Sequence, residues 1–451
     1  VFKTLESLWL FVHSLFYVGW LNFLLVLGLL ALLAIKLYSS IFVDRDYYRR
    51  YDADASKWQG QALRIAMVTN NYLPFIGGVP ISIDRLRRGL QQRGHRVRII
   101  APGYPGQDDR GVDVVRVPSL GTWAGRSEFR VANPLSRRMG RGLKSFTPDL
   151  IHIHHPFWLG WTAQWQARRL GVPTVFTYHT RLEHYSHFVP LPGPLFRNLI
   201  AHAAVRRFAN RCHGVIVPTE SAEEYLRVIG VTVPIHVRAT GVDLACFQTP
   251  RPRTVERLRR RYGIQPGDRV LVSASRLSQE KNVDFLLAAT DVLRRRSTQA
   301  FRCLIIGEGE KRQRLQDGIH KLGLAEVVTL VGAVPPDDMA GYYQLADVFV
   351  FASQSETQGM VILEAMAAGL PVVAVRSSGI DDVVQQGRNG YKTAADIDQW
   401  VAAAQCLIED DALRARMARC AADTASRHTV DRFAAQVSAT YVQVLAQYHA
   451  C

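Results

Sequence analysis

Short β-rich runs alternate with helical stretches in two series along the chain, and this pattern constrains the fold more than any other feature. The first series has candidate strands at 64–69, 96–102, 112–117, 149–154, 174–179, 214–219 and 235–239. The second has them at 269–277, 301–309, 327–332, 347–353 and 371–375. Helical spacing is expected at 79–93, around 194–211 and throughout 395–448. Alternation of this kind predicts parallel sheets covered by helices on both faces.

The chain has 451 residues, which is too long for one ordinary core. We therefore predict an α/β protein with two facing, doubly wound, Rossmann-like domains at 64–240 and 269–428. Prolines and charged residues mark a linker at 241–268, and a C-terminal helix at 429–451 is expected to cross back to the first domain. Because ligands of such sheets bind at the carboxyl ends of the strands, the site is expected between the domains.

The N-terminal segment is strongly apolar. From Ser7 to Ile35 it contains no Asp, Glu, Lys or Arg, and about 20 apolar residues can span a bilayer. We expect a membrane anchor, a transmembrane helix within 1–43, followed by a juxtamembrane linker at 44–63. A cleaved signal peptide is the alternative, but the apolar run is long and no cleavage site clearly follows it.

Basic residues after this run set the expected orientation. Lys36, Arg45, Arg49 and Arg50 follow the apolar segment. Positive charge favours the cytoplasmic side, so we expect a single-pass anchor in the cell membrane with the later domains in the cytoplasm. Gly19 leaves a re-entrant hairpin open as a second possibility.

The formal charge of +16 is unevenly distributed. Residues 64–230 carry 23 basic and 10 acidic side chains, whereas residues 231–451 carry 26 and 24. A solvated basic surface is the simplest explanation, and a face turned toward an anionic partner is the more specific one. Beside a membrane anchor, an anionic membrane surface is a better partner than nucleic acid, for which no zinc-finger or RNA-binding signature is found.

Two glutamates eight positions apart, Glu356 and Glu364, follow the candidate strand at 347–353. Glu356 is expected in the loop at the strand's carboxyl end and Glu364 on the next helix, with Thr357 or Gln358 as the helix cap. A helix start suits a phosphate, and carboxylates accept hydrogen bonds from hydroxyls. The pair therefore suggests a ligand with hydroxyls on both sides of a diphosphate, such as a nucleotide-sugar. The alternative is one glutamate that merely favours the helix dipole and one exposed glutamate.

Other candidate strand ends supply cations and glycines. Arg276 and Lys281 lie five positions apart, where they either clamp a diphosphate or are ordinary surface cations. Glu308 stands between two glycines, which form a tight turn or approach a ligand closely. Gly77 and Gly78 lie at the first strand end of the other domain, where a diphosphate would meet that domain. They do not match the dinucleotide fingerprint, which argues against a dinucleotide cofactor.

A run of histidines at 151–156 raises the question of a metal site. On a strand, His152 and His154 share a face and His155 points away. Zinc needs a defined set of ligands with suitable geometry. We therefore expect hydrogen-bonded histidines and no metal.

The stretches "RLSQEKN", "IIGEGE" and "SETQGMVILEAMAAGLPVV", in this order, resemble the retaining glycosyltransferases of GT-B fold in family 4. The resemblance covers about residues 64–448. It implies that Arg276 and Lys281 hold the donor diphosphate, that Glu356 contacts the donor sugar and that Glu364 contacts the ribose. The helix start at Gly359, Met360 and Val361 would meet the phosphate and sugar. No metal or other cofactor is implied, because cations and the helix start neutralise the leaving diphosphate.

The stretches "FTYHTRLEHYSHFVP" and "GVIVPT" resemble the lipid-glycosylating branch, the diacylglycerol glucosyltransferases and sulfolipid synthases. This implies a membrane-associated enzyme that moves a sugar from a nucleotide-diphosphate donor, with a UDP-sugar favoured, to a lipid acceptor such as diacylglycerol. His154 would line the sugar site as a catalytic group, and His179 and Tyr178 would face the acceptor. The alternatives are transfer to a polyprenyl-linked glycan or lipopolysaccharide, a nucleotide-sugar epimerase, and a non-catalytic membrane scaffold.

Overall fold

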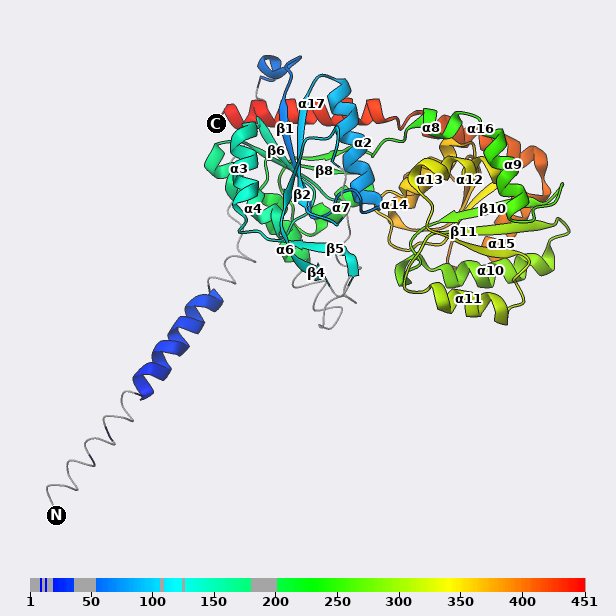
Figure 1. The fold of residues 1–451 in the computed structure, drawn as a ribbon, viewed down its shortest axis with the longest axis horizontal. Coiled ribbons are helices and arrows are strands. Elements are labelled where there is room, and N and C mark those ends of the chain that lie inside the picture. The colour runs from blue at the N-terminus through cyan, green and yellow to red at the C-terminus, as the bar shows by residue number, and fades with distance from the viewer. Residues whose placement is uncertain are drawn as a thin grey trace.

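The computed structural model describes residues 9, 13, 19–35, 54–105, 109–123, 126–179 and 201–450. Figure 1 shows two α/β domains side by side, with the long red helix α17 (Val430–His449) lying along the first of them. The chain passes between the domains twice, near Val242 and near Thr429. The two crossings are adjacent, since these residues form an isolated bridge. The predicted arrangement of two doubly wound domains is confirmed.

The N-terminal domain is built on a parallel sheet in the order β3-β2-β1-β6-β7-β8-β9, counted over the described residues. Its strands are β1 (Arg64–Val68), β2 (Arg96–Pro102), β3 (Val114–Val117), β6 (Leu150–Ile153), β7 (Thr174–Thr177), β8 (Gly214–Val217) and β9 (Ile235–Val237). Each lies within a predicted strand, and most are shorter than predicted. The antiparallel hairpin of β4 (Ser119–Trp123) and β5 (Arg126–Ala132) was not predicted.

Helices cover both faces of this sheet. They are η1 (Ser56–Trp58), α2 (Gly78–Gln92), α3 (Arg137–Phe146), α4 (Leu159–Leu170), α6 (His202–Asn210) and α7 (Glu220–Val228). Successive residues of β1 point to opposite faces. Ile65 and Met67 join a buried cluster with α2 and α17, whereas Ala66 and Val68 join one with α3 and α4. From Ile65 on, the strand is therefore apolar, as expected of a sheet buried on both faces.

The C-terminal domain repeats this design with a parallel sheet in the order β12-β11-β10-β13-β14-β15 within the described chain. The strands are β10 (Arg269–Ala274), β11 (Phe301–Ile306), β12 (Val328–Gly332), β13 (Val348–Phe351), β14 (Val372–Val375) and β15 (Gly390–Thr393). The helices are η4 (Gln279–Lys281), α10 (Val283–Arg296), α11 (Arg312–Lys321), η5 (Pro336–Asp338), α12 (Met339–Leu345), α13 (Met360–Ala367), α14 (Ser378–Asp381), α15 (Ile397–Glu409) and α16 (Asp411–Ser426). Strand β15 was not predicted.

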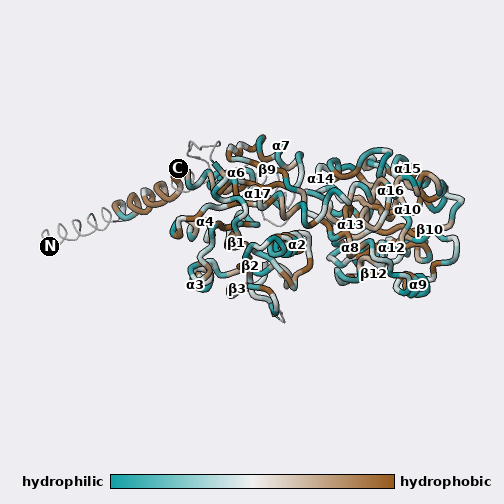
Figure 2. Tube along the Cα trace, turned by 90° about the horizontal axis from the view of Figure 1, so that it is seen from above, coloured by the Kyte–Doolittle hydropathy of each residue, from teal (hydrophilic) through white to brown (hydrophobic). Residues whose placement is uncertain are grey.

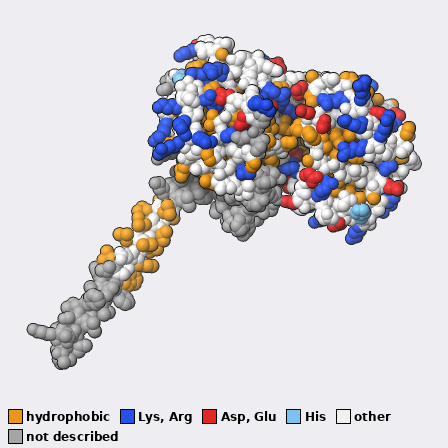
Figure 3. All heavy atoms as spheres, in the orientation of Figure 1, with side chains coloured by type: hydrophobic (Ala, Val, Ile, Leu, Met, Phe, Trp, Pro, Cys, Tyr) orange, Lys and Arg blue, Asp and Glu red, His pale blue; other side chains and the backbone are white. Residues whose placement is uncertain are grey.

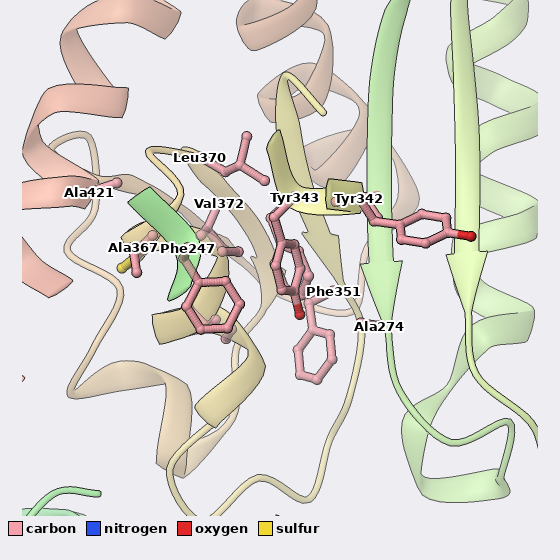
Figure 4. Close-up of a cluster of buried hydrophobic side chains, with 14 of the residues drawn as sticks. Phe247, Ala274, Tyr342, Tyr343, Phe351, Ala367, Leu370, Val372 and Ala421 are labelled. Atoms are coloured by element: carbon pink, nitrogen blue, oxygen red, sulfur yellow. The ribbon is translucent and has the colours of Figure 1, made fainter. Parts of the chain in front are cut away.

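Residues 241–268, expected as a linker, contain the two short helices α8 (Leu244–Gln248) and α9 (Pro252–Arg261). Phe247 of α8 and Leu258 of α9 are buried in the core of the C-terminal domain. Figure 4 shows Phe247 close to Tyr343, with Phe351 nearby in the same cluster. Most of this segment is therefore packed onto the second domain.

Helix α17 belongs to the core of the first domain although it is the last element of the chain. Phe433, Val437 and Tyr441 are buried there with Ile65 and Met67. A Cβ on Gly89 of α2 would lie 2.6 Å from the Cβ of Ala434, so the two helices approach too closely for a larger residue. The expected anchor at 1–43 and linker at 44–63 lie partly outside the described residues.

The described part of the apolar segment is helical at 19–35 and points away from both domains (Figure 1). Its large apolar side chains, such as Leu21, Leu29 and Ile35, are more than half exposed, and Figure 2 shows the helix as a hydrophobic stretch. Within the described residues, no helix combines the length and apolarity that crossing a membrane requires.

Candidate functional site

The two domains meet through loops at the carboxyl ends of their strands. Thr219, after β8, donates through Oγ1 to the carbonyl of Thr357, after β13, at 3.0 Å. The side chain of Gln358 forms two hydrogen bonds with the backbone of Thr240, at 2.9 and 2.8 Å. A Cβ on Gly78 would lie 3.4 Å from the Cε of Met360. The junction is therefore built at the edges where ligands of such sheets bind.

Arg276, Lys281 and Glu356 lie together on the C-terminal side of this junction. They follow β10 and β13, which are hydrogen-bonded neighbours in the sheet. Lys281 Nζ lies 2.5 Å from Glu356 Oε1, and both side chains are about 15% exposed or less. Arg276 Nη2 donates to Glu280 at 3.1 Å. The pattern places two cations and two carboxylates at adjacent strand ends.

The charge partners keep the glutamates of this group ionised. Burial opposes the charged form of Glu356, but the ammonium of Lys281 and the guanidinium of Arg276, with neighbouring hydrogen bonds, together hold its pKa below the ordinary value. Burial likewise opposes the charge of Glu280, whereas the hydroxyl of Ser278 and the guanidinium of Arg276 help to lower its pKa. Both carboxylates are therefore acceptors of hydrogen bonds near neutral pH.

The glycines around Glu308 position the loop that carries Arg276. A Cβ on Gly307, whose φ is +135°, would lie 1.8 Å from the carbonyl oxygen of Ser275, and one on Gly309 would lie 2.4 Å from that of Leu277. The glycines thus approach this loop closely, and the expected contact with a ligand is not needed to explain them. Glu308 itself is half exposed and pairs with Arg312 at 2.9 Å.

Helix α13 begins at the junction, next to Glu356. Its N-cap is Gly359 in the left-handed conformation, with φ +68°, and no side chain caps the helix. The expectation that Thr357 or Gln358 caps it is therefore wrong, because Gln358 is used in the contact with Thr240. Met360 and Val361 form the first turn, whose free N–H groups suit an anion.

Glu364, on the inner face of α13, is held by the opposite domain. Arg85 of α2 donates through Nη2 to Glu364 Oε1 at 2.6 Å, and Tyr343 donates to Oε2 at 3.4 Å. Burial and the adjacent Glu364 raise the pKa of Tyr343 well above its ordinary value, so Tyr343 remains a donor. Sequence spacing does not reveal Arg85. The available signal is an arginine among the buried positions Ile83, Leu86 and Leu90 of α2.

Four histidines gather near the ends of β6 and β7 on the N-terminal side: His152, His154, His155 and His179. His152 is hydrogen-bonded to Tyr441 and Thr177 at 2.7 and 2.6 Å. His154 Nδ1 lies 2.9 Å from His179 Nε2, and their rings are stacked. Burial lowers the pKa of both His154 and His179 well below the ordinary value, so both are neutral at pH 7.

Several polar atoms near the junction have no hydrogen-bond partner in the part of the chain that the structure describes. They include His154 Nε2, on a residue only 2% exposed, and Ser355 Oγ, next to Glu356. Unsatisfied buried polar atoms are uncommon and indicate a partner such as a ligand or water. Over the same residues, no group of His, Cys, Asp and Glu is arranged to hold a metal.

Two other residues predicted at the site, Tyr178 and Gly77, are not part of the charged group or of the histidine pair. Tyr178 is 1% exposed and stacks against Tyr225 in the core of the N-terminal domain, so its ring does not face the junction. Gly77 is the N-cap of α2, and the chain runs from it into Gly78, which meets Met360. Of the two residues expected to face an acceptor, His179 lies beside His154, whereas Tyr178 lies in the core of the N-terminal domain.

Two protein-family models match the chain. "Glycosyl transferases group 1" matches residues 254–424, and "Glycosyltransferase Family 4" matches residues 76–246. The first covers most of the C-terminal domain with Arg276, Lys281, Glu356 and Glu364. The second covers most of the N-terminal domain with Arg85, His154 and His179.

Among curated proteins, the chain is 34% identical over 321 residues to the alpha-monoglucosyldiacylglycerol synthase of Streptococcus pneumoniae, covering 69% of this chain and 71% of that protein. It is 33% identical over 336 residues to a GDP-mannose-dependent alpha-mannosyltransferase of Mycobacterium tuberculosis, covering 73% and 83%. A solved structure of Anabaena HepE in complex with UDP and glucose superposes with a TM-score of 0.69 at 19% identity, covering 84% of this chain and 99% of that one.

Proposed function

This chain belongs to the group 1 and family 4 glycosyltransferases and is a hexosyltransferase of GT-B fold, and on that premise we propose its donor, acceptor and location. The donor is a nucleotide-diphosphate sugar, with UDP-glucose favoured. The acceptor is a membrane lipid with a free hydroxyl, such as diacylglycerol. Transfer retains the configuration of the sugar, and no metal is required.

The observation that carries the proposal is the meeting of Arg276, Lys281 and Glu356 at the adjacent ends of β10 and β13, beside the start of α13. Two cations and a helix start suit a diphosphate, and the ionised glutamate suits sugar hydroxyls. The relative from Streptococcus pneumoniae is named for a glucosyl lipid and supports both the donor sugar and the acceptor class.

The residues divide the work of transfer between the domains. Arg276 and Lys281 stabilise the charge that develops on the diphosphate as its bond to the sugar breaks, and the start of α13 adds its partial positive charge. Glu356 accepts hydrogen bonds from the sugar and, with Lys281, fixes its position. The acceptor hydroxyl forms the new bond to the sugar, and its proton leaves with the phosphate oxygen or to solvent.

The neutral pair of His154 and His179 serves the sugar from the opposite domain. The Nε2 atom of His154 is buried and unpartnered within the described residues, so a donor sugar hydroxyl can satisfy it. Because burial keeps the ring neutral, His154 can donate or accept a proton in a hydrogen bond without placing a positive charge beside a developing cationic sugar. His179 holds the orientation of its ring.

An exposed surface on α3 and α4 supports work on a lipid acceptor. We call it the basic–aromatic surface, and its exposed side chains are Arg137, Arg138, Arg141, Lys144, Trp161, Trp165, Arg168 and Arg169. Trp161 and Trp165 are 57% and 48% exposed, and Arg169 lies over the ring of Trp165 at 3.9 Å. The two helices adjoin, because a Cβ on Gly140 would lie 3.0 Å from Gln166.

This composition fits an anionic bilayer. Basic side chains are attracted to anionic headgroups, and tryptophan favours the interface between headgroups and acyl chains. Figure 3 shows Lys and Arg side chains gathered over this edge of the N-terminal domain. The apolar segment at 7–35 adds a membrane anchor to the proposal, with Lys36 and the following arginines on the cytoplasmic side.

The experiment presents the purified chain with vesicles that contain diacylglycerol, ceramide or polyprenyl phosphate, each with labelled UDP-glucose, UDP-galactose or GDP-mannose. The expected result is an α-linked product from UDP-glucose and diacylglycerol. Transfer only from GDP-mannose would replace the proposed donor with the one named for the mannosyltransferase relatives. Transfer only to polyprenyl phosphate would replace the acceptor, and absence of any transfer or donor hydrolysis would contradict the proposal.

A further inference from the structure

A buried ion pair joins the two domains at Glu364, the glutamate that the family resemblance assigns to the donor ribose. Arg85 Nη2 and Glu364 Oε1 are 2.6 Å apart, and the two side chains are 8% and 11% exposed. Arg85 Nη1 also donates to the carbonyl of Gly241 at 3.2 Å, in the segment that connects the domains. One guanidinium therefore links α2, the connecting segment and α13.

The contacts around Arg85 indicate that its ion pair with Glu364 forms only when the two domains are packed together. Ser82, one turn earlier on α2, shares a hydrogen bond of 2.9 Å with Thr240, which is itself bound by Gln358 of the C-terminal domain. A Cβ on Gly241 would lie 2.4 Å from the carbonyl oxygen of Thr429, so the two crossing segments are also in contact. Arg85 can reach Glu364 only while these contacts hold the domains together.

A buried ion pair of this kind contributes geometry more than stability, because the cost of removing both charges from water offsets their attraction. The planar guanidinium fixes the direction of the carboxylate to which it donates. Glu364 has capacity left for a ligand, since a carboxylate accepts about four hydrogen bonds and Arg85 and Tyr343 provide two donors.

We propose that Arg85 is a positioning residue for the nucleotide: it orients Glu364 toward the ribose hydroxyls and does so only when the domains are packed together. The inference rests on the proposed function, because it takes a nucleotide-sugar as the donor, and on the resemblance that makes Glu364 the ribose contact. It adds that nucleotide affinity is coupled to the arrangement of the domains. By linkage, a bound nucleotide favours the packed arrangement by the same factor.

The experiment measures binding of UDP and of 2′,3′-dideoxy-UDP to the full chain by calorimetry, for the wild type and for Arg85→Met. The wild type should bind UDP about tenfold or more tightly than the dideoxy analogue, because the analogue leaves a buried acceptor unpaired. In Arg85→Met this ratio should fall toward one while the affinity for the analogue is kept. Equal weakening of both nucleotides, with the ratio unchanged, would overturn the inference, since general damage to the fold has that effect.

Further variants guard against loss of structure, because Arg85→Met leaves a buried carboxylate without its charged partner. Arg85→Lys should restore part of the ratio. The double variant Arg85→Met with Glu364→Gln should lower the ratio no further than Glu364→Gln alone, and additive losses would contradict a shared role. Arg87→Met, on the same helix with its partners Asp84 and Gln91 also on that helix, is the control and should keep the wild-type ratio.

Failure of the inference can be told from failure of the proposed function. A wild-type protein that does not bind UDP would contradict the proposed donor and this inference with it. A wild-type protein that discriminates between the two nucleotides, beside an Arg85→Met variant that discriminates equally well, would overturn the inference alone.

Discussion

The two domains share a design but present opposite chemistry to the junction. The C-terminal domain presents ions: Arg276, Glu280, Lys281 and Glu356, paired with one another at the ends of two adjacent strands. The N-terminal domain presents neutral rings: His154 and His179, whose pKa values burial holds well below the ordinary value. Apart from the Arg85–Glu364 pair that links the domains, the same sheet architecture therefore carries a charged wall on one side and an uncharged wall on the other.

The difference shows how the work of a transferase can be divided. A diphosphate needs fixed positive charge, whereas the region next to a cationic, oxocarbenium-like sugar needs polarity without further positive charge. The N-terminal domain carries a group of basic side chains on the outer basic–aromatic surface, away from the paired ions of the other domain (Figure 3). The predictions below test this division, beginning with the largest effect.

Removing the Lys281–Glu356 pair from the charged wall should strongly reduce transfer. The double variant Lys281→Met with Glu356→Gln removes both members of a pair and avoids an isolated buried charge. Turnover should fall by about 10²- to 10³-fold, and UDP affinity should fall as well, because the diphosphate loses a fixed cation. Labelled transfer to vesicles and calorimetry with UDP measure the two effects.

The control removes an ion pair at the opposite end of α10, with Arg296→Gln and Asp398→Asn. This pair is exposed and should leave turnover unchanged. Native turnover in the Lys281 and Glu356 double variant would contradict a role of this ion pair in transfer.

Changing the neutral wall should separate transfer from nucleotide binding. His154→Ala should lower turnover by about tenfold to a hundredfold, because a buried hydrogen bond to the sugar is lost. UDP affinity should remain as in the wild type, since the nucleotide lies on the other domain. A variant that loses UDP binding yet keeps the rate at saturating donor would reverse the assignment of the two walls.

The outer surface should matter only on anionic membranes. Arg137→Gln with Arg141→Gln removes two charges from α3 and should weaken binding to vesicles of anionic phospholipid by about tenfold or more. High salt should reproduce the loss in the wild type. Arg257→Gln with Arg261→Gln on α9 removes two exposed arginines at the same spacing from the other domain, and equal weakening by this control would show that total charge, not this surface, decides binding.

Acid should unfold the N-terminal domain first. Burial lowers the pKa of His152 to about 3 and that of His155 to about 4, whereas the unfolded chain takes up these protons near pH 6.5. The stability is therefore fully present above pH 6.5 and is lost as pH falls toward 4. A fully buried histidine such as His152 contributes on the order of 1–2 kcal/mol of this loss between pH 6.5 and 5. Hydrogen exchange at pH 7 and 5, read separately for the two domains, should show faster opening around β6, and earlier opening of the C-terminal sheet would contradict this.

Much of the fold could be predicted because buried parallel strands are continuous apolar runs. The apolar residues of β1 and of β14 are bounded by polar or glycine-containing turns. Both strands appear where they were predicted. The β4–β5 hairpin was missed because its strands contain Gly121 and charged residues instead of an apolar run. Strand β15, with the sequence GYKT, is missed for the same reason.

The site could be predicted only where its residues follow strand ends in sequence. Arg276, Lys281 and Glu356 meet this condition, and their meeting follows from the pairing of β10 with β13. Arg85 does not, because its partner Glu364 is 279 positions away and on another domain. The helix cap was missed because Gly359 adopts the left-handed conformation and releases Gln358 for the contact with Thr240.

The central claim is that a sugar nucleotide binds at the junction, with its diphosphate on the charged wall. Hydrogen exchange of the full chain with and without saturating UDP tests it most directly. Slower exchange is expected at 276–281 and at 355–361, with a smaller effect at 69–78 on the opposite domain. Protection confined to other parts of the chain, or equal exchange at these three segments with and without bound UDP, would contradict the account.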